Sequence, residues 1–294
     1  MFNPDDFKLS FSSWSAPAQT VQELVETAKA SGYSGLELRT AIPGTEPHAH
    51  GVEHDMAAPS LADVRHKLAD GGIELACIAT GVALDAPDSE KLIDDLKRYV
   101  TLAETLGAPW VRVLGGSLST ERGEIAGEVD AAADALAEAV SFAEQTKVSL
   151  LLETHGDYAT TKYVREVVKQ VYSDHFGVLW DVVEPFRVLE TMEEAYDNIG
   201  DQIKHVHIHD VRYVDGRMKL EPAVVGEGVV PIATAIKYLA HDGYEGYLSV
   251  ETRLGPPEDV LPQCAKVLHD LISEAFPETE EDVEEAEVKT GEEA

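Results

Sequence analysis

The sequence is poor in cysteine, in basic side chains and in long apolar runs. Only two cysteines are present, Cys77 and Cys264, which excludes a framework of several disulfides and a metal site made of cysteines alone. No stretch approaches the ~18 consecutive apolar residues of a membrane-spanning helix. The first ten residues, MFNPDDFKLS, carry acid before any apolar run, unlike a secretory signal. We therefore expect a cytoplasmic protein with no membrane partner.

Basic residues are outnumbered by acidic ones, with 23 Lys and Arg against 55 Asp and Glu and a formal net charge of −32. Nucleic acids and anionic membranes are bound through Lys and Arg that displace counterions, so this balance argues against both as partners. Excess carboxylate is typical of proteins from a salt-rich cytoplasm, where screening lengths are short. An acidic surface that binds a partner is the alternative. If the acidity reflects a salt-rich cytoplasm, the net charge says little about the ligand.

The chain does contain a regular alternation of short β-rich runs and amphipathic helical segments. Its 294 residues, 44% of them hydrophobic, are enough for a substantial core. The predicted strands are residues 8–14, 35–39, 73–81, 110–116, 148–156, 176–183, 203–211 and 246–253. The predicted helices are residues 20–32, 60–72, 90–107, 128–146, 161–172, 231–243 and 259–276, with a weaker helix at 187–200.

Strict alternation of strand and helix indicates βαβ units with parallel strands. Eight such units predict a closed (β/α)8 TIM barrel, which belongs to the α/β class. A doubly wound open sheet is the runner-up, but no GxGxxG or Walker loop supports nucleotide binding on such a sheet. We predict one barrel domain over residues 1–276. Residues 277–294 are an acidic run with few large apolar side chains, which predicts a disordered tail.

Four chemistry-bearing residues fall at the ends of the last four predicted strands, where barrel active sites are built. They are Glu153, Asp181, His207 and Glu251. Alternation of side chains along a strand allows all four to point into the barrel. Three carboxylates gathered in one mouth repel each other unless a cation joins them. This donor set favours one Mn²⁺, Mg²⁺ or Co²⁺ ion, with Zn²⁺ as the alternative.

The heptapeptide HVHIHDV at 205–211 places three histidines on one face of a strand and two β-branched residues on the other. His207 is the predicted metal ligand because three carboxylates accompany it. His205 lies deeper and is interpreted as structural. For His209, near the mouth, a substrate contact and a structural role remain open.

These motifs resemble the xylose isomerase-like TIM barrels, the sugar-phosphate isomerase/epimerase group of the endonuclease-IV-like superfamily. The resemblance covers roughly residues 8–275. It is carried by Glu-Thr-His at 153–155, Asp181, the His-x-x-Asp at 207–210, Gly-Glu-Gly at 226–228 and Glu251. It implies that Glu153, Asp181, His207 and Glu251 hold one divalent metal.

The resemblance also implies the chemistry. In ketose epimerases of this family, two glutamates at the positions of Glu153 and Glu251 move a proton on the carbon beside the carbonyl through an enediolate. Many relatives carry Asp-x-x-His at strand six, whereas this chain has Asp181 and Glu184, which puts one substrate contact in doubt. Relatives commonly form dimers or tetramers, so a homodimer or homotetramer is open.

Other residues near the predicted mouth are candidate substrate contacts. Arg39 and Arg112 point inward, either to a substrate carboxylate or phosphate or to a structural ion pair, for example with Glu37. Arg212 lies near an arginine that contacts substrate in epimerase relatives, with solvent exposure as its alternative. His155 is a candidate for orienting the metal ligand Glu153, and Glu184 for accepting a hydrogen bond from a substrate hydroxyl.

The sequence therefore favours a metal-dependent isomerase or epimerase of a small sugar or polyhydroxy carbonyl compound. Three alternatives remain. One is a metal-dependent dehydratase of an inosose-like substrate, because both reactions begin with enolisation. Another is an abasic-site nuclease of the endonuclease-IV kind. The last is a sugar- or metal-binding barrel without turnover.

Overall fold

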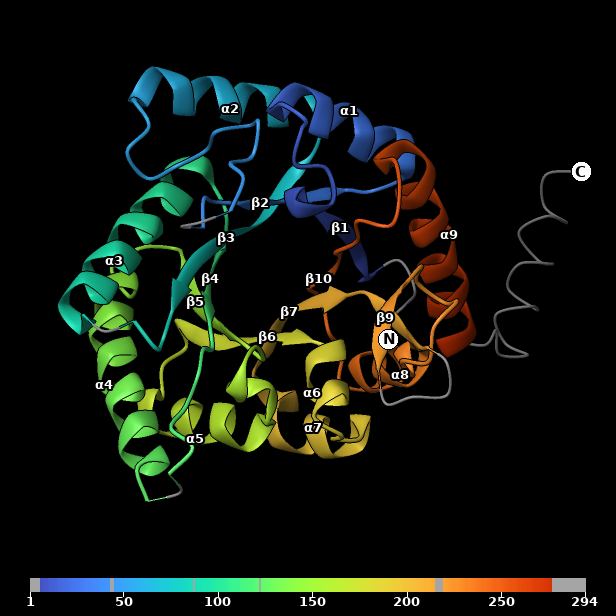
Figure 1. Cartoon of the computed structure of the whole chain (residues 1–294). Helices are drawn as coiled ribbons and strands as arrows, with labels where there is room; N and C mark the ends of the chain where they lie inside the picture. The colour runs from blue at the N-terminus through green and yellow to red at the C-terminus, as the bar shows by residue number, and fades with distance from the viewer. Residues whose placement is uncertain (1–5, 43–44, 87, 122, 215–218, 277–294) are drawn as a thin grey trace, which may run out of the picture.

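The protein is a closed barrel of eight parallel strands ringed by helices (Figure 1). The computed structural model describes residues 6–42, 45–86, 88–121, 123–214 and 219–276. The strands follow each other around the ring in the order β1–β10–β7–β6–β5–β4–β3–β2. Their bounds are β1 Lys8–Ser12, β2 Gly35–Arg39, β3 Glu74–Ala83, β4 Trp110–Leu114, β5 Ser149–Glu153, β6 Phe176–Asp181, β7 Ile203–Ile208 and β10 Tyr247–Val250.

This ring confirms the predicted (β/α)8 barrel, and the open sheet is wrong because β1 pairs with β10. The predicted tail, 277–294, lies outside the described residues. No helix of the described residues is both long and apolar enough to cross a membrane.

The helices form where the apolar spacing predicts them, except for the short α6 (Val183–Arg187), which was not predicted. They are α1 Val21–Ser31, α2 Ala58–Gly71, α3 Ser89–Leu106, α4 Ile125–Ala143, α5 Thr161–Val171, α6 Val183–Arg187, α7 Met192–Ile199, α8 Ile232–His241 and α9 Pro257–Ala275. Helix α1 shows the local signals clearly. Thr20 and Glu23 form a reciprocal capping box at its start, and Gly32 ends it with a φ of 82°. The weaker helix predicted at 187–200 forms only as α7, because α6 ends at Arg187 and a second capping box on Thr191 begins α7.

The barrel strands carry apolar side chains outward, against the helices, and polar side chains inward. Val206 and Ile208 of β7 are fully buried in the hydrophobic layer. The inward positions of several strands hold charged or titratable groups that are at most 2% exposed, namely Glu37, Arg112, Glu153, His205 and His207. Charges at that depth are tolerated only when they are paired. The polar interior therefore must be a connected network, and it leads toward the mouth of the barrel.

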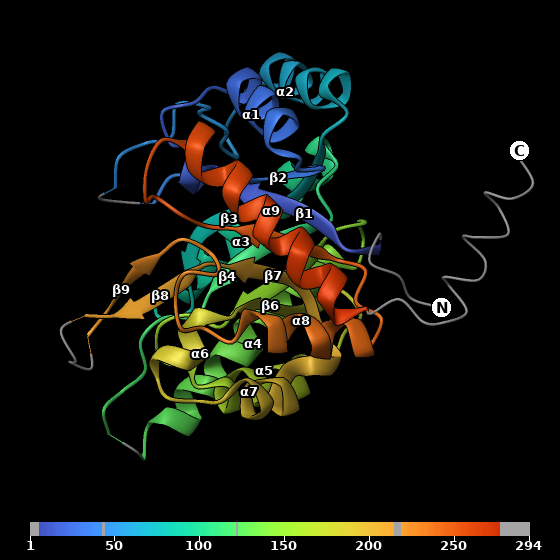
Figure 2. The same ribbon diagram turned by 90° about the vertical axis from the view of Figure 1, so that its right-hand side faces the viewer.

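A two-stranded antiparallel hairpin, absent from the prediction, follows β7. Its strands are β8 Asp210–Tyr213 and β9 Leu220–Ala223. It projects beyond the end of the barrel, on the side where the loop before α2 also extends (Figure 2). The predicted seventh strand, 203–211, was too long, because β7 ends at Ile208 and the chain starts a new pairing at Asp210.

The buried carboxylate of Asp210 fastens the segment that returns from the hairpin. It accepts backbone hydrogen bonds from Val211 (2.8 Å), Gly226 (3.0 Å), Gly228 (2.9 Å) and Val230 (3.1 Å). A Cβ on Gly228 would lie 2.0 Å from Oδ1 of Asp210, so only glycine fits there. The Gly-Glu-Gly motif is thus a loop shaped around one carboxylate, and its amide groups at 226 and 228 are already occupied.

Candidate active site

His207 is the centre of the polar network at the barrel mouth. Its Nδ1 atom lies 3.0 Å from Oε1 of Glu153 and 3.9 Å from Oε2 of Glu251. Its Nε2 atom lies 2.9 Å from Oε2 of Glu37. Burial opposes a charged ring, but the carboxylates of Glu37, Glu251 and Glu153 outweigh it and raise the pKa of His207 well above its ordinary value. Three carboxylates thus converge on one buried imidazole.

Asp181 joins this centre from the end of β6, directly beside His207 in the sheet register. Ligand atoms of Glu153, Asp181 and His207 all lie within 4.8 Å of one another, and so do those of Glu37, His207 and Glu251. The structure therefore brings together all four residues that the sequence predicts as metal ligands. His207 belongs to both groups, which are Glu153–Asp181–His207 and Glu37–His207–Glu251.

Asp181 is held in place by its own contacts. Its Oδ1 atom accepts hydrogen bonds from the backbone N–H groups of Val183 (2.8 Å) and Glu184 (3.2 Å). Nε2 of His209 lies 2.9 Å from each of its carboxylate oxygens. Burial raises the pKa of Asp181, but His209 outweighs it and the net direction is down. His209, 21% exposed in its side chain, therefore orients a carboxylate at the rim.

Glu184, which stands where many relatives have histidine, lies beside this pair. Ligand atoms of Asp181, Glu184 and His209 lie within 4.8 Å of one another. Burial and the charge of Asp181 raise the pKa of Glu184. Nε of Arg187 lies 3.1 Å from its Oε1 atom. The side chain therefore belongs to the mouth and is shared between Arg187 and the Asp181–His209 pair.

Glu37 is the residue that sequence reasoning missed as part of the centre. It is fully buried in β2, and its Oε2 atom lies 2.9 Å from Nε2 of both His205 and His207. Burial raises the pKa of Glu37, but His207 and His205 outweigh burial and hold it well below the ordinary value. Alternation in LELR does place Glu37 inward, but only the closed barrel shows that its partners are on β7.

The two inward arginines have different surroundings. Arg112 is 1% exposed and donates to the carbonyl oxygen of Thr80 through Nη2 (2.9 Å) and Nε (3.3 Å). Its Nη1 atom lies 3.3 Å from Oε2 of Glu153. The structural ion pair considered for Arg112 therefore forms with Glu153 and not with Glu37. Arg39 is half-buried and lies 5.7 Å from the ring centre of Trp14.

Two predicted contacts lie outside the cluster. His155 follows β5 with an exposed side chain. Arg212 is exposed on β8, opposite Glu221 of β9 in the hairpin register. Among the described residues neither makes a hydrogen bond or an ion pair with the His207 centre, but the charge of His155 contributes to the lowered pKa of Glu153.

The centre offers oxygen atoms that a cation could use. Oε1 of Glu251 is buried and lacks a hydrogen-bond partner among the described residues. Oε2 of Glu153 also accepts no hydrogen bond there, but it lies 3.3 Å from Nη1 of Arg112 in an ion pair. Burial raises the pKa of Glu153, but Arg112 and His207 outweigh it and hold that pKa at about 2, so this carboxyl is ionised. Carboxylate oxygens with one imidazole nitrogen are the donors that divalent ions of intermediate hardness accept. The residues therefore fit a divalent metal.

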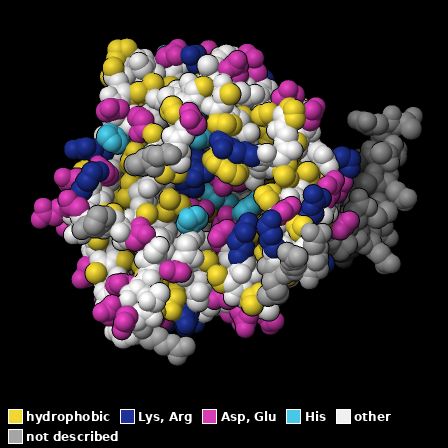
Figure 3. All heavy atoms as spheres, in the orientation of Figure 1, with side chains coloured by type: hydrophobic (Ala, Val, Ile, Leu, Met, Phe, Trp, Pro, Cys, Tyr) yellow, Lys and Arg dark blue, Asp and Glu magenta, His cyan; other side chains and the backbone are white. Residues whose placement is uncertain are grey.

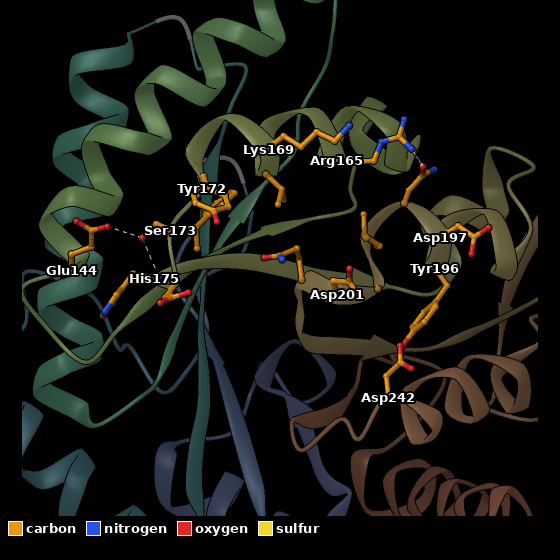
Figure 4. A pocket seen from close by; sticks show the side chains of 17 residues that line it. Glu144, Arg165, Lys169, Tyr172, Ser173, His175, Tyr196, Asp197, Asp201 and Asp242 are labelled. Atoms are coloured by element: carbon orange, nitrogen blue, oxygen red, sulfur yellow. Dashed lines mark hydrogen bonds between the residues drawn. The ribbon is translucent and has the colours of Figure 1, made fainter.

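A large hollow in the described part of the chain lies elsewhere. It opens between α5 and α7, near the amino ends of β6 and β7 (Figure 4). Several of its polar side chains are paired with each other, for example Ser173 with Glu144 and Tyr196 with Asp242. In this fold the amino ends of the strands serve stability and the carboxyl ends serve chemistry. The centre at His207 is therefore the candidate site.

Comparison with known proteins agrees with this geometry. Residues 25–271 match the family described as xylose isomerase-like TIM barrel. The chain belongs to this family. One curated relative is fructoselysine 3-epimerase of Escherichia coli O157:H7, 28% identical over 124 residues, which are 40% of this chain and 44% of the relative. The chain spans about half the length of the curated relatives it matches.

Solved structures of similar fold cover nearly the whole chain. A xylose isomerase-like barrel from Mycobacterium smegmatis in complex with magnesium has a TM-score of 0.72 at 16% identity, covering 94% of this chain and 100% of that one. An L-ribulose 3-epimerase has a TM-score of 0.71 at 17% identity, covering 91% and 95%. A probable 3-DHS dehydratase from Bacillus anthracis has a TM-score of 0.71 at 18% identity, covering 89% and 98%. These likenesses show the fold.

Proposed function

We propose that this protein is a divalent-metal-dependent isomerase or epimerase of a small sugar or polyhydroxy carbonyl compound. One observation carries the proposal. Carboxylate oxygens of Glu153 and Glu251 lie 3.0 and 3.9 Å from the same imidazole nitrogen, Nδ1 of His207, although the two residues come from separate parts of the barrel. A binding protein needs no such pair, whereas moving a proton between two faces of a substrate does.

In this proposal Glu153, Asp181, His207 and Glu251 hold the metal. When bound, the ion supplies positive charge that acidifies the hydrogen beside a substrate carbonyl. One glutamate accepts that hydrogen as a proton, and the other glutamate returns a proton to the opposite face. Arg112 keeps Glu153 ionised, and Glu37 orients the ring of His207. The barrel walls exclude bulk water from the exchange.

Exchange in heavy water tests this function. The purified protein is incubated with Mn²⁺ and a panel of ketoses in D₂O, and proton NMR follows the hydrogen beside the carbonyl. Deuterium entering at that carbon, with a second sugar appearing and no loss of water, is the expected result. Enolisation followed by loss of water would show the dehydratase alternative. Absence of exchange on every ketose would refute both.

Replacing Glu37 with glutamine should weaken metal binding without removing a ligand. Glutamine keeps the shape but loses the charge that fixes His207, and loss of such a supporting carboxylate costs about 10- to 100-fold in metal affinity. Titration calorimetry with Mn²⁺ measures the effect directly. Glu74→Gln, at the other end of the barrel where it contacts Lys8 and Tyr247, is the charge-matched control. Equal affinity in both variants would contradict the role given to Glu37.

The net charge bears on which partners this protein binds. We propose a small-molecule substrate and no nucleic acid, because a formal net charge of −32 repels phosphate backbones. The same charge makes the abasic-site nuclease the weaker alternative.

A further inference from the structure

One wall of the barrel mouth is basic in an otherwise acidic protein. It is formed by Arg39 at the end of β2, Trp14 in the turn after β1, Arg253 after β10 and His48 in the loop before α2, and we call these residues the basic wall. Strands β10, β1 and β2 are consecutive in the ring, so the four residues share one side of the mouth. Dark blue and cyan side chains gather near the centre of this face in Figure 3.

Both arginines lie against one aromatic ring. The guanidinium carbon of Arg253 is 4.7 Å from the ring centre of Trp14, and that of Arg39 is 5.7 Å away. Arg253 also donates from Nε to the carbonyl oxygen of Trp14 (2.8 Å). Stacking on an aromatic face holds a guanidinium plane and leaves its edge free for hydrogen bonds. Trp14 is thus a fixed support for two cations.

Neither arginine forms a close ion pair with a carboxylate of the described chain, although the charges of Glu251, Glu153 and Glu37 act on Arg39 at longer range. No carboxylate oxygen there lies within 4.0 Å of a guanidinium nitrogen of Arg39 or Arg253. Arg39 is half-buried and Arg253 is exposed, and both lack a close carboxylate although the sequence holds 55 acidic residues. Burial first, and then Arg39 and Arg253, lower the pKa of His48 to about 4. Both arginines therefore lie near enough to His48 to disfavour a positive charge on its ring.

The basic wall lies just beyond the reacting carboxylates. Arg39 follows Glu37 by two residues on the same face of β2, about 7 Å nearer the rim by the rise of a strand. Arg253 follows Glu251 by two residues. A small ketose with its carbonyl between Glu153 and Glu251 would therefore direct its far end toward this wall.

We propose that the basic wall binds an anionic group, a phosphate or a carboxylate, at the end of the substrate remote from the carbonyl. The substrate class is then an anionic ketose, and the inference rests on the function proposed above. Planar guanidinium groups match the oxygens of both anions through paired N–H donors. The whole-protein field repels anions, so a substrate of this class needs such a local counter-charge.

Binding of three matched ketoses tests the inference separately from turnover. Calorimetry measures D-fructose, D-fructose 6-phosphate and D-fructuronate on the Mn²⁺-loaded protein and on the chelator-treated protein, at one fixed ionic strength. One or both anionic ketoses should bind at least about tenfold more tightly than fructose, since a charge-assisted hydrogen bond contributes about that factor. Comparison of fructose 6-phosphate with fructuronate identifies whether phosphate or carboxylate is preferred.

Single substitutions show which residues cause the preference for an anionic ketose. Arg39→Gln and Arg253→Gln should each reduce the preference for the anionic ketose about tenfold while leaving fructose binding unchanged. Arg39→Lys should recover part of it. Arg65→Gln, which removes one exposed positive charge on α2, should change nothing. Circular dichroism confirms that each variant is folded.

The outcomes separate this inference from the proposed function. Equal binding of all three ketoses, or an anion preference that survives in both arginine variants, would overturn the inference even if deuterium exchange occurs. An anion preference that depends on Arg39 and Arg253, with no exchange on any ketose, would support the basic wall and refute the isomerase.

Discussion

Replacing Glu251 with glutamine is expected to lower kcat for ketose exchange by about 10³-fold. Glutamine keeps the size of the side chain but can neither accept nor return a proton. A positioned acid or base typically contributes 10²- to 10⁴-fold. The side chain is only 12% exposed, so water replaces it poorly. Proton NMR in D₂O, at saturating Mn²⁺, measures the loss.

Two controls show whether the proton transfer itself is lost. Glu258→Gln changes an exposed carboxyl at the start of α9 and should retain full activity. Metal content must be measured in both variants, because Glu251 is also a proposed ligand. A Glu251→Gln variant that binds Mn²⁺ and still exchanges at the wild-type rate would remove Glu251 from the mechanism.

Replacing Asp210 with alanine is expected to lower the free energy of unfolding by about 3 kcal/mol. Four backbone N–H groups lose their acceptor, and unpaired buried donors cost about 1–3 kcal/mol each where water cannot reach them. Part of the segment at 226–229 is exposed, so some donors regain water. The total therefore stays below the sum of four full penalties.

Urea unfolding followed by circular dichroism measures this change. Asp201→Ala, at an exposed position before β7, is the matched control and should stay within about 0.5 kcal/mol of the wild type. Equal midpoints for Asp210→Ala and Asp201→Ala would mean that the carboxylate does not hold the returning segment. Asp210 differs from the residues of the candidate site, because its carboxylate accepts hydrogen bonds from backbone amides.

Periodicity was sufficient to predict the barrel because each strand buries its outward face in a repeated way. It could not predict the hairpin, because β8 and β9 are short and carry exposed residues such as Arg212 and Tyr213. The same face of β7 continues through His209, so the sequence shows no break where the structure has one. Local pattern predicts elements that pack on the core and misses those that only pair with each other.

The ends of four strands predicted the candidate centre, since barrel geometry alone brings strand ends together. The residues that hold these four side chains in place could not be predicted. Glu37 meets His205 and His207 across the barrel, 168 and 170 positions away in the sequence. Arg253 meets Trp14 at a separation of 239 positions. Such partners depend on side-chain directions inside a closed ring, and no short motif records them.

The pairing of β1 with β10 has a consequence for how the molecule is made. The first strand has one edge without a partner until the last strand arrives, so nascent chain emerging from the ribosome carries an open sheet. Contacts of such wide sequence separation slow folding. Glu251 follows β10 directly, so a partly synthesised chain that lacks β10 also lacks one of the four predicted metal ligands.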